Sequence, residues 1–175
     1  MNRIGEIKKY AEEYIIGSIY SHIEEDRKYL YQHADEVKSA LALRMRQILS
    51  NDKGINKVVI CYLYSSIAMK RQELCIIPFM DMPFVMQLEN EIYIEYSEIL
   101  GYSIMEEDHL ERILRNKFVQ LLPYEIEEII REYMYRYSEK IGELLSEILC
   151  GGEEGIKVFF GSYMGEVKEI GRIVL

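Results

Sequence analysis

The most regular pattern in the chain is a stripe of apolar side chains that recur every three or four residues across residues 124–150. This spacing predicts one long amphipathic helix, and Gly151 is placed to end it. Glutamate–arginine pairs four residues apart, such as Glu127 with Arg131, favour the same helix. The stripe consists of Ile126, Ile130, Tyr133, Tyr137, Ile141, Leu144 and Ile148.

A second helix is predicted to begin near Ile104, because Ser103 and Glu106 have the spacing of a capping box. It ends before Pro123, since a residue that precedes proline disfavours the helical conformation. The short link between the two helices predicts a C-terminal helical hairpin.

Residues 3–50 contain no proline and repeat apolar residues at helical spacing, which predicts a long N-terminal amphipathic helix or a helix pair. An unbroken helix of this length would span about 70 Å, too long for a compact domain of this size. Asp26 interrupts the apolar repeat, so a break is expected there, with Asp26 capping the second helix. The alternative is that Asp26 is a buried functional acid.

The middle of the chain is harder to assign from pattern alone. Residues 55–70 are apolar on nearly all sides, which fits a buried strand or a buried helix, and the length of the run favours a helix. Residues 74–77 and 84–86 predict two short strands joined by a turn at 81–83.

The remaining segments complete an α+β fold that is mainly helical. Residues 91–100 predict a short helix that ends at Gly101, and residues 155–175 predict an antiparallel hairpin with several glycines. The middle hairpin and the C-terminal hairpin would form a small antiparallel sheet. No linker divides the chain, so we expect a single domain over residues 1–175.

The charge balance argues against a nucleic-acid partner. The chain has 175 residues, with 21 basic and 30 acidic side chains and a formal net charge of -9. Affinity for nucleic acids comes mainly from lysine and arginine contacts with phosphates, and no basic stripe forms here. The longest apolar run, residues 58–69, is shorter than the stretch of about 20 residues that spans a bilayer, so no membrane partner is expected.

The cysteines indicate a reducing compartment. Cys61, Cys75 and Cys150 are odd in number and lack the C-x-x-C spacing of a zinc ribbon. The first residues lack the apolar core of a secretory signal. We therefore expect a cytoplasmic protein with reduced thiols. Cys61 and Cys75 lie in apolar runs, where burial raises the pKa of a thiol and lowers its reactivity.

Motifs that carry catalysis or hold a cofactor are absent from the sequence. There is no phosphate-binding loop and no nucleophile elbow. His109 follows Glu106 by three residues, but a di-iron bundle needs this motif twice. His22 and His33 would lie about 16 Å apart along a straight helix, too far to share one ion. We expect no catalytic residue, no metal and no cofactor.

Three methionines, Met80, Met82 and Met86, surround the predicted middle turn. Soft sulfur at this spacing is compatible with Cu(I), but methionine clusters serve mostly as adaptable packing or binding surfaces. The three residues are candidates for a small-ligand site between this hairpin and the helices.

The tyrosines point most directly to a function. Tyr133 and Tyr137 fall within the apolar stripe and are expected in the core. Tyr20, Tyr124 and Tyr135 fall on faces with mixed charge, and exposed tyrosines are frequent hot spots of protein interfaces. We predict that these three bind a partner; the alternative is that they are scattered surface residues.

These observations favour a small cytoplasmic accessory or regulatory protein that acts by protein–protein interaction without catalysis. Its partner would be another protein, or a second copy in a homo-oligomer. Two alternatives stay open: an enzyme or enzyme subunit with a site assembled from dispersed residues, and a small-ligand binding module.

Overall fold

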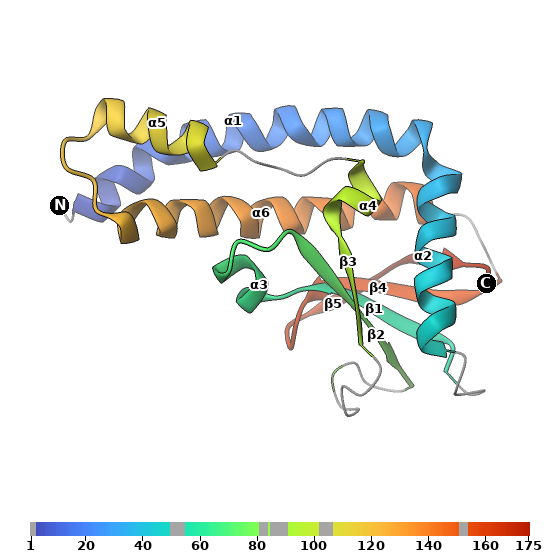
Figure 1. The fold of residues 1–175 in the computed structure, drawn as a ribbon. Helices are drawn as coiled ribbons and strands as arrows, with labels where there is room; N and C mark the ends of the chain where they lie inside the picture. Colours follow the sequence, from blue (N-terminus) through green and yellow to red (C-terminus); the bar gives the residue numbers. More distant parts are fainter. Residues whose placement is uncertain (1–2, 50–54, 81–83, 85–90, 102–106, 151–153) are drawn as a thin grey trace.

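The strands of the chain collect into one sheet that lies beneath a layer of long helices (Figure 1). The computed structural model describes residues 3–49, 55–80, 84, 91–101, 107–150 and 154–175. In this part the helices are α1 (Arg3–Gln32), α2 (Ala34–Leu49), α3 (Tyr64–Ala68), α4 (Tyr96–Leu100), α5 (Glu107–Lys117) and α6 (Pro123–Leu149). The strands are β1 (Lys57–Tyr62), β2 (Glu73–Phe79), β3 (Ile92–Glu95), β4 (Ile156–Ser162) and β5 (Val167–Ile173).

The predicted α+β fold, mainly helical, is confirmed, but the sheet is mixed. The strand order is β3-β2-β1-β4-β5. Neighbouring strands are antiparallel except β1 and β4, which run parallel from Lys57 opposite Lys157 to Tyr62 opposite Ser162. A parallel pair needs a crossover connection, and here the connection contains α6. The prediction of a purely antiparallel sheet was therefore wrong.

The preference for a helix over residues 55–70 was also wrong, because this segment forms β1 and then the short helix α3. Strand β1 lies at the centre of the sheet and is buried on both faces. Val58 and Ile60 face the main core, whereas Val59 and Cys61 belong to a second apolar cluster on the other face. A strand buried on both faces loses its alternating pattern and resembles a buried helix in sequence.

The other middle predictions are confirmed in part. Strand β2 contains the predicted residues 74–77, and the first half of the predicted helix 91–100 is strand β3 instead. The second half is helix α4, which ends as expected at Gly101, whose φ of 74° is left-handed. Phe84 lies in a turn and not in a strand; the predicted turn at 81–83 and residues 85–86 lie outside the described residues.

The C-terminal elements agree with their patterns. Helix α6 and the β4–β5 hairpin occupy the segments predicted for them. Helix α5 ends at Lys117, so its link to α6 is longer than the spacing to Pro123 suggested. The start predicted for that helix near Ile104, and Gly151 beyond α6, lie outside the described residues.

The predicted break at Asp26 was wrong. Helix α1 continues through Asp26 to Gln32, and the chain bends at His33 before α2 begins. Asp26 does not cap a helix; it is fully buried and accepts a hydrogen bond from the Tyr137 hydroxyl of α6. A buried carboxyl group is tolerated where it is hydrogen-bonded, so the acid occupies a core position of the α1 stripe.

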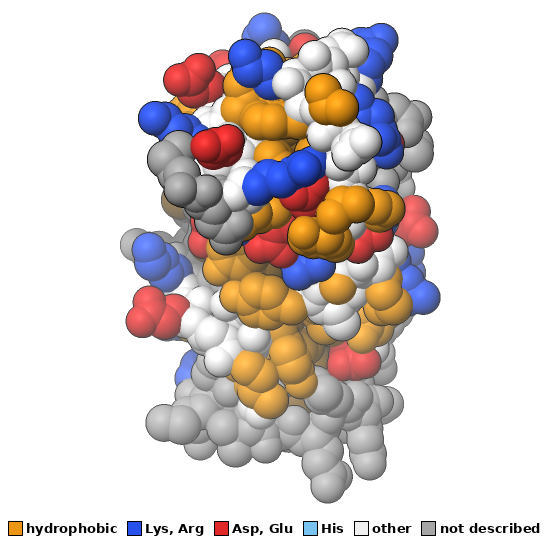
Figure 2. Space-filling view, turned by 90° about the vertical axis from the view of Figure 1, so that its left-hand side faces the viewer, with side chains coloured by type: hydrophobic (Ala, Val, Ile, Leu, Met, Phe, Trp, Pro, Cys, Tyr) orange, Lys and Arg blue, Asp and Glu red, His pale blue; other side chains and the backbone are white. Residues whose placement is uncertain are grey.

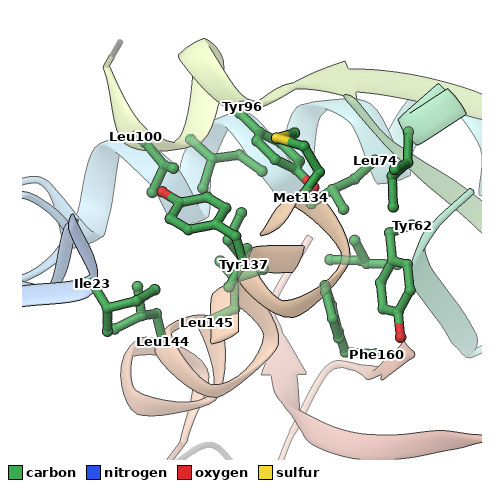
Figure 3. Close-up of a cluster of buried hydrophobic side chains, with 14 of the residues drawn as sticks. Ile23, Tyr62, Leu74, Tyr96, Leu100, Met134, Tyr137, Leu144, Leu145 and Phe160 are labelled. Carbon is green, nitrogen blue, oxygen red and sulfur yellow. The ribbon is translucent and has the colours of Figure 1, made fainter. Parts of the chain in front are cut away.

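Helix α1 packs beside α6, and the two run in the same direction (Figure 1). Their contact is bordered by ion pairs at both ends: Arg3 Nε lies 3.1 Å from Glu125 Oε1, and Arg27 Nε lies 3.0 Å from Glu147 Oε2. Side chains from α1, α4, α6 and the sheet meet around Tyr137 (Figure 3). Helix α6 is therefore enclosed by α1 on one side and by the sheet on another.

The hydrogen bond between Tyr137 and Asp26 leads to a first prediction. Tyr137→Phe removes a donor from a buried carboxyl group, and we expect the free energy of unfolding to fall by about 1–3 kcal/mol. Tyr20→Phe, on the exposed face of α1, is the matched control and should change it by less than about 0.5 kcal/mol. Urea denaturation measures both. Equal stability of the two variants would contradict the structural role of this bond.

Candidate protein-interaction groove along α6

One face of α6 is only partly covered, and it carries the exposed residues Tyr124, Arg131 and Glu139 together with half-buried Tyr135. These positions are separated by seven, four and four residues, which places them on one side of a helix. Helix α3 packs against the first part of α6, and the β4–β5 hairpin packs against the last part. The face therefore forms one wall of a furrow whose other wall is built by α3 and then by the hairpin.

The furrow has two hollows. The smaller, of about 170 Å³, lies between α3 and α6, with Met69 and Lys70 on one wall and Glu127 and Arg131 on the other. The larger, of about 680 Å³, lies between α6 and the β4–β5 hairpin. Its lining is Tyr62, Tyr135, Glu139, Gly142, Glu143, Ser146, Phe160, Gly161, Ser162, Glu166, Lys168, Glu169 and Ile170.

Three tyrosines cluster beside the larger hollow, and two of them, Tyr62 and Tyr135, line it. The Tyr135 ring meets the Tyr62 ring edge to face, with ring centres 5.4 Å apart, and it stacks on the Tyr64 ring at 5.5 Å. The Tyr64 hydroxyl donates a hydrogen bond of 3.3 Å to the Tyr135 hydroxyl. Tyr62 is buried, Tyr135 is half-buried and Tyr64 is 55% exposed. The cluster thus extends from the core to the surface and offers an aromatic face to solvent.

The surroundings of these three tyrosines disfavour the ionised form of their hydroxyl groups. Burial raises the pKa of Tyr62 above its usual value, although a hydrogen bond with Tyr135 partly offsets it. The hydrogen bond with Tyr135, followed by burial, raises the pKa of Tyr64. The hydrogen bond with Tyr64 lowers the pKa of Tyr135, but Tyr62 and burial outweigh it, so that this pKa is raised as well. The Glu139 carboxylate adds to the rise in all three.

Two of the carboxylates in the larger hollow are neutralised by lysines. Glu143 Oε1 lies 2.7 Å from Lys140 Nζ, and Glu169 Oε2 lies 3.4 Å from Lys157 Nζ. Glu139, on α6, and Glu166, on the hairpin, are exposed and make no ion pair with any residue that the structure describes. Two carboxylates on opposite walls therefore give this hollow a negative rim.

The partner-binding tyrosines predicted from the sequence are placed differently from one another. Tyr124 is 60% exposed at the start of the furrow, and Tyr135 lies in the aromatic cluster on the same helix face. Tyr20 is 62% exposed but lies on α1. It is about 25 Å along α1 from Arg3, the residue that contacts the start of α6. The structure thus brings Tyr124 and Tyr135 onto one surface and leaves Tyr20 on another.

The methionine site is only partly visible. Met80 is exposed just after β2, where its carbonyl oxygen accepts a 2.8 Å hydrogen bond from Lys57 Nζ. Met82 and Met86 lie outside the described residues, so the ligand site proposed for the three stays a prediction.

The histidines and cysteines do not assemble a reactive centre in the described part of the chain. The Nδ1 atom of His22 lies 2.9 Å from the Tyr133 hydroxyl, and that of His33 lies 2.9 Å from Glu36 Oε2. The side chain of His109 is outside the described residues, and no group of three potential metal ligands occurs among those described. Cys61 lies opposite Cys75 across β1 and β2, and contact with that thiol together with burial raises the pKa of Cys61, as the sequence predicted.

Sequence reasoning did not identify Tyr62, Tyr64 and Glu166, and it placed Glu139 on the same helix face as Tyr135 without making it a site residue. Tyr62 and Tyr64 come from the segment assigned to a helix, where no local pattern marks them as a pair. Their only signal is that Tyr62 and Tyr64 are two residues apart, the spacing that places side chains on one face of a strand. This signal can be used only after the segment has been identified as a strand.

Comparison of the chain with protein-family models, with curated proteins and with solved structures finds no match. Among the helices that the structure describes, none combines the length and the apolar content needed to cross a bilayer.

Gly142 lets α6 pack closely on β4 beside the larger hollow, because a Cβ atom at this position would overlap the ring of Phe160. Alanine is the better helix former, yet Gly142→Ala should lower the free energy of unfolding by about 1–3 kcal/mol through this overlap. At Gly17, on α1, an added Cβ atom would meet nothing within 4 Å, so Gly17→Ala should raise the free energy of unfolding by about 1 kcal/mol. Thermal and urea unfolding measure both variants; stabilisation by Gly142→Ala would contradict the close packing of α6 on β4.

The tyrosine cluster leads to a prediction on pH. Because the Glu139 carboxylate disfavours a second negative charge, Glu139→Gln should lower the pKa values of Tyr62, Tyr64 and Tyr135 towards the usual tyrosine value of about 10. They should stay above it, since burial and hydrogen bonds remain. NMR titration of the tyrosine Cζ carbons, assigned with phenylalanine variants, measures this. Glu13→Gln on α1 is the control and should leave the three unchanged; unchanged values in Glu139→Gln would exclude this charge coupling.

Proposed function

We propose that the chain is a cytoplasmic accessory or regulatory protein without catalysis, which acts by binding another protein along the α6 furrow. The observation that carries this proposal is the set of large apolar side chains along the furrow. Tyr64, Met69 and Tyr124 are 55%, 56% and 60% exposed. Exposed aromatic and methionine side chains gathered on one surface are typical of protein interfaces.

The surface around the start of α6 supports the same proposal. Val119 and Leu122, in the link between α5 and α6, are also exposed. Arg3 holds this link in place, since its guanidinium donates hydrogen bonds to the carbonyl oxygens of Val119 and Gln120. Hydrophobic side chains form a broken band down this end of the molecule, interrupted by charged ones (Figure 2). A fixed apolar surface interrupted by charges fits a protein partner.

The length of the furrow favours a polypeptide over a small molecule. From Tyr124 to Ser146 the helix rises about 33 Å, which equals the length of roughly ten residues of extended chain. Small-ligand sites are usually enclosed cavities that bury most of the ligand, whereas both hollows open along one surface. An extended segment or a helix of a partner fits this shape.

Affinity capture with matched tyrosine variants tests the proposal. Tyr64→Ser and Tyr20→Ser remove the same side chain at sites of similar exposure, one in the furrow and one on α1. We expect a partner that co-purifies in fixed stoichiometry with the wild-type chain and with Tyr20→Ser. Tyr64→Ser should weaken the complex by about tenfold, the effect of removing one aromatic hot spot.

Two results would overturn the proposal. One is a partner that depends on Tyr20 and not on Tyr64, which would place the interface on α1. The other is a complex that forms equally with both variants and leaves amide hydrogen exchange in α3 and α6 unchanged. Size-exclusion chromatography of the purified chain shows whether the partner is a second copy.

A further inference from the structure

The larger hollow has a negative rim whose charge is only partly compensated. Glu139 projects from α6 and Glu166 from the β4–β5 hairpin, and neither forms an ion pair with a described residue. The neutralised pairs of Glu143 and Glu169 lie on the same walls, and among the described residues that line the hollow Lys168 is the one cation. A ligand that places positive charge between Glu139 and Glu166 would be electrostatically complementary to this hollow.

The lining adds aromatic rings to these carboxylates. Tyr62, Tyr135 and Phe160 all line the hollow. Aromatic faces attract ammonium and guanidinium groups, and they also pack well against the aliphatic stems of lysine and arginine. The carboxylates therefore match the cationic group of a lysine or arginine, and the rings match its aliphatic stem. A surface with carboxylates alone would match only the cationic group.

The walls of the hollow are held rigidly. Gly142 allows α6 to rest on the Phe160 ring, and a Cβ atom at Gly161 would overlap the Glu166 carbonyl oxygen across the hairpin. The hairpin is tied to β1, because the Tyr163 amide donates a 3.0 Å hydrogen bond to the Tyr62 carbonyl oxygen. A site that is formed before binding loses less entropy on complex formation.

We propose that this hollow receives a lysine or arginine side chain from an extended, basic segment of the partner protein. This proposal rests on the proposed function and adds the chemistry of the partner. The carboxylates of Glu139 and Glu166 contact the cationic group from both walls, and the rings of Tyr135 and Phe160 contact its stem. The rest of the segment follows α6 towards Tyr124.

Binding of defined peptides to the full chain tests this chemistry. The probe is a nine-residue synthetic peptide that alternates lysine with serine or leucine, and its control has glutamate in place of lysine. We expect the lysine peptide to bind, with NMR shift changes concentrated in α6 and the β4–β5 hairpin, and the glutamate peptide not to bind. Raising the salt concentration should weaken binding, because exposed charge pairs are screened.

Matched charge variants separate a specific site from general attraction to an acidic chain. Glu139→Gln with Glu166→Gln should weaken binding of the lysine peptide by about tenfold, which corresponds to about 1.4 kcal/mol. Glu13→Gln with Glu25→Gln removes the same charge from the exposed face of α1 and should weaken it less than twofold. Equal losses in the two double variants would overturn the proposal.

Further outcomes distinguish this inference from the proposed function. If a partner depends on Tyr64 but the lysine peptide does not bind, the furrow is an interface and the basic-segment proposal is wrong. If the peptide binds in the hollow while no partner depends on Tyr64, the proposed interface fails and the cation site stands. Tighter binding of spermine than of the peptide would assign the hollow to a small polyamine and overturn the assignment to a protein segment.

Discussion

The parallel pairing of β1 with β4 is the contact on which the rest of the structure depends. It joins the middle strands to the C-terminal hairpin in one sheet, and it requires the chain to return across that sheet between the two strands. Helix α6 makes this return, which places its Gly142 on Phe160 of β4 and its outer face beside the hairpin. The furrow is a direct result of this crossover.

The same arrangement explains why α6 presents two such different sides. Towards α1 it contributes Tyr137, whose hydroxyl satisfies the buried Asp26. On its other side the short helix α3 and the hairpin cover only parts of its length, so Tyr135 and Glu139 remain accessible. A helix longer than the elements that cover it leaves part of its surface available for another molecule.

Local patterns were sufficient for elements whose neighbours leave one face exposed. The stripe of α6 and the glycine-bounded strands β4 and β5 could be predicted because burial on one side produces a period in the sequence. Strand β1 could not, since the core covers one face and a second apolar cluster covers the other. The break at His33 instead of Asp26 could not be predicted either, because Asp26 is accommodated by a tyrosine more than a hundred residues away.

The residues of the candidate site also fall into two groups, those that a local pattern could place and those that it could not. Helical periodicity alone places Tyr124 and Tyr135 on one face, eleven residues apart, and the structure agrees. Tyr62, Tyr64 and Glu166 join that face only through the sheet, and no spacing within their own segments indicates it. Tyr20 is exposed on α1 and takes no part in the furrow.

The separation of β1 from β4 in the chain also has a consequence for folding during synthesis. Lys57 pairs with Lys157, so the edge of β1 that β4 covers remains unpaired until most of the chain has left the ribosome. That edge belongs to a strand whose residues from Val58 to Tyr62 are all buried in the finished protein. Unpaired apolar strand edges are prone to associate with other chains, and contacts between distant residues form slowly. The newly made protein is therefore most vulnerable to aggregation in the interval between the synthesis of β1 and that of β4.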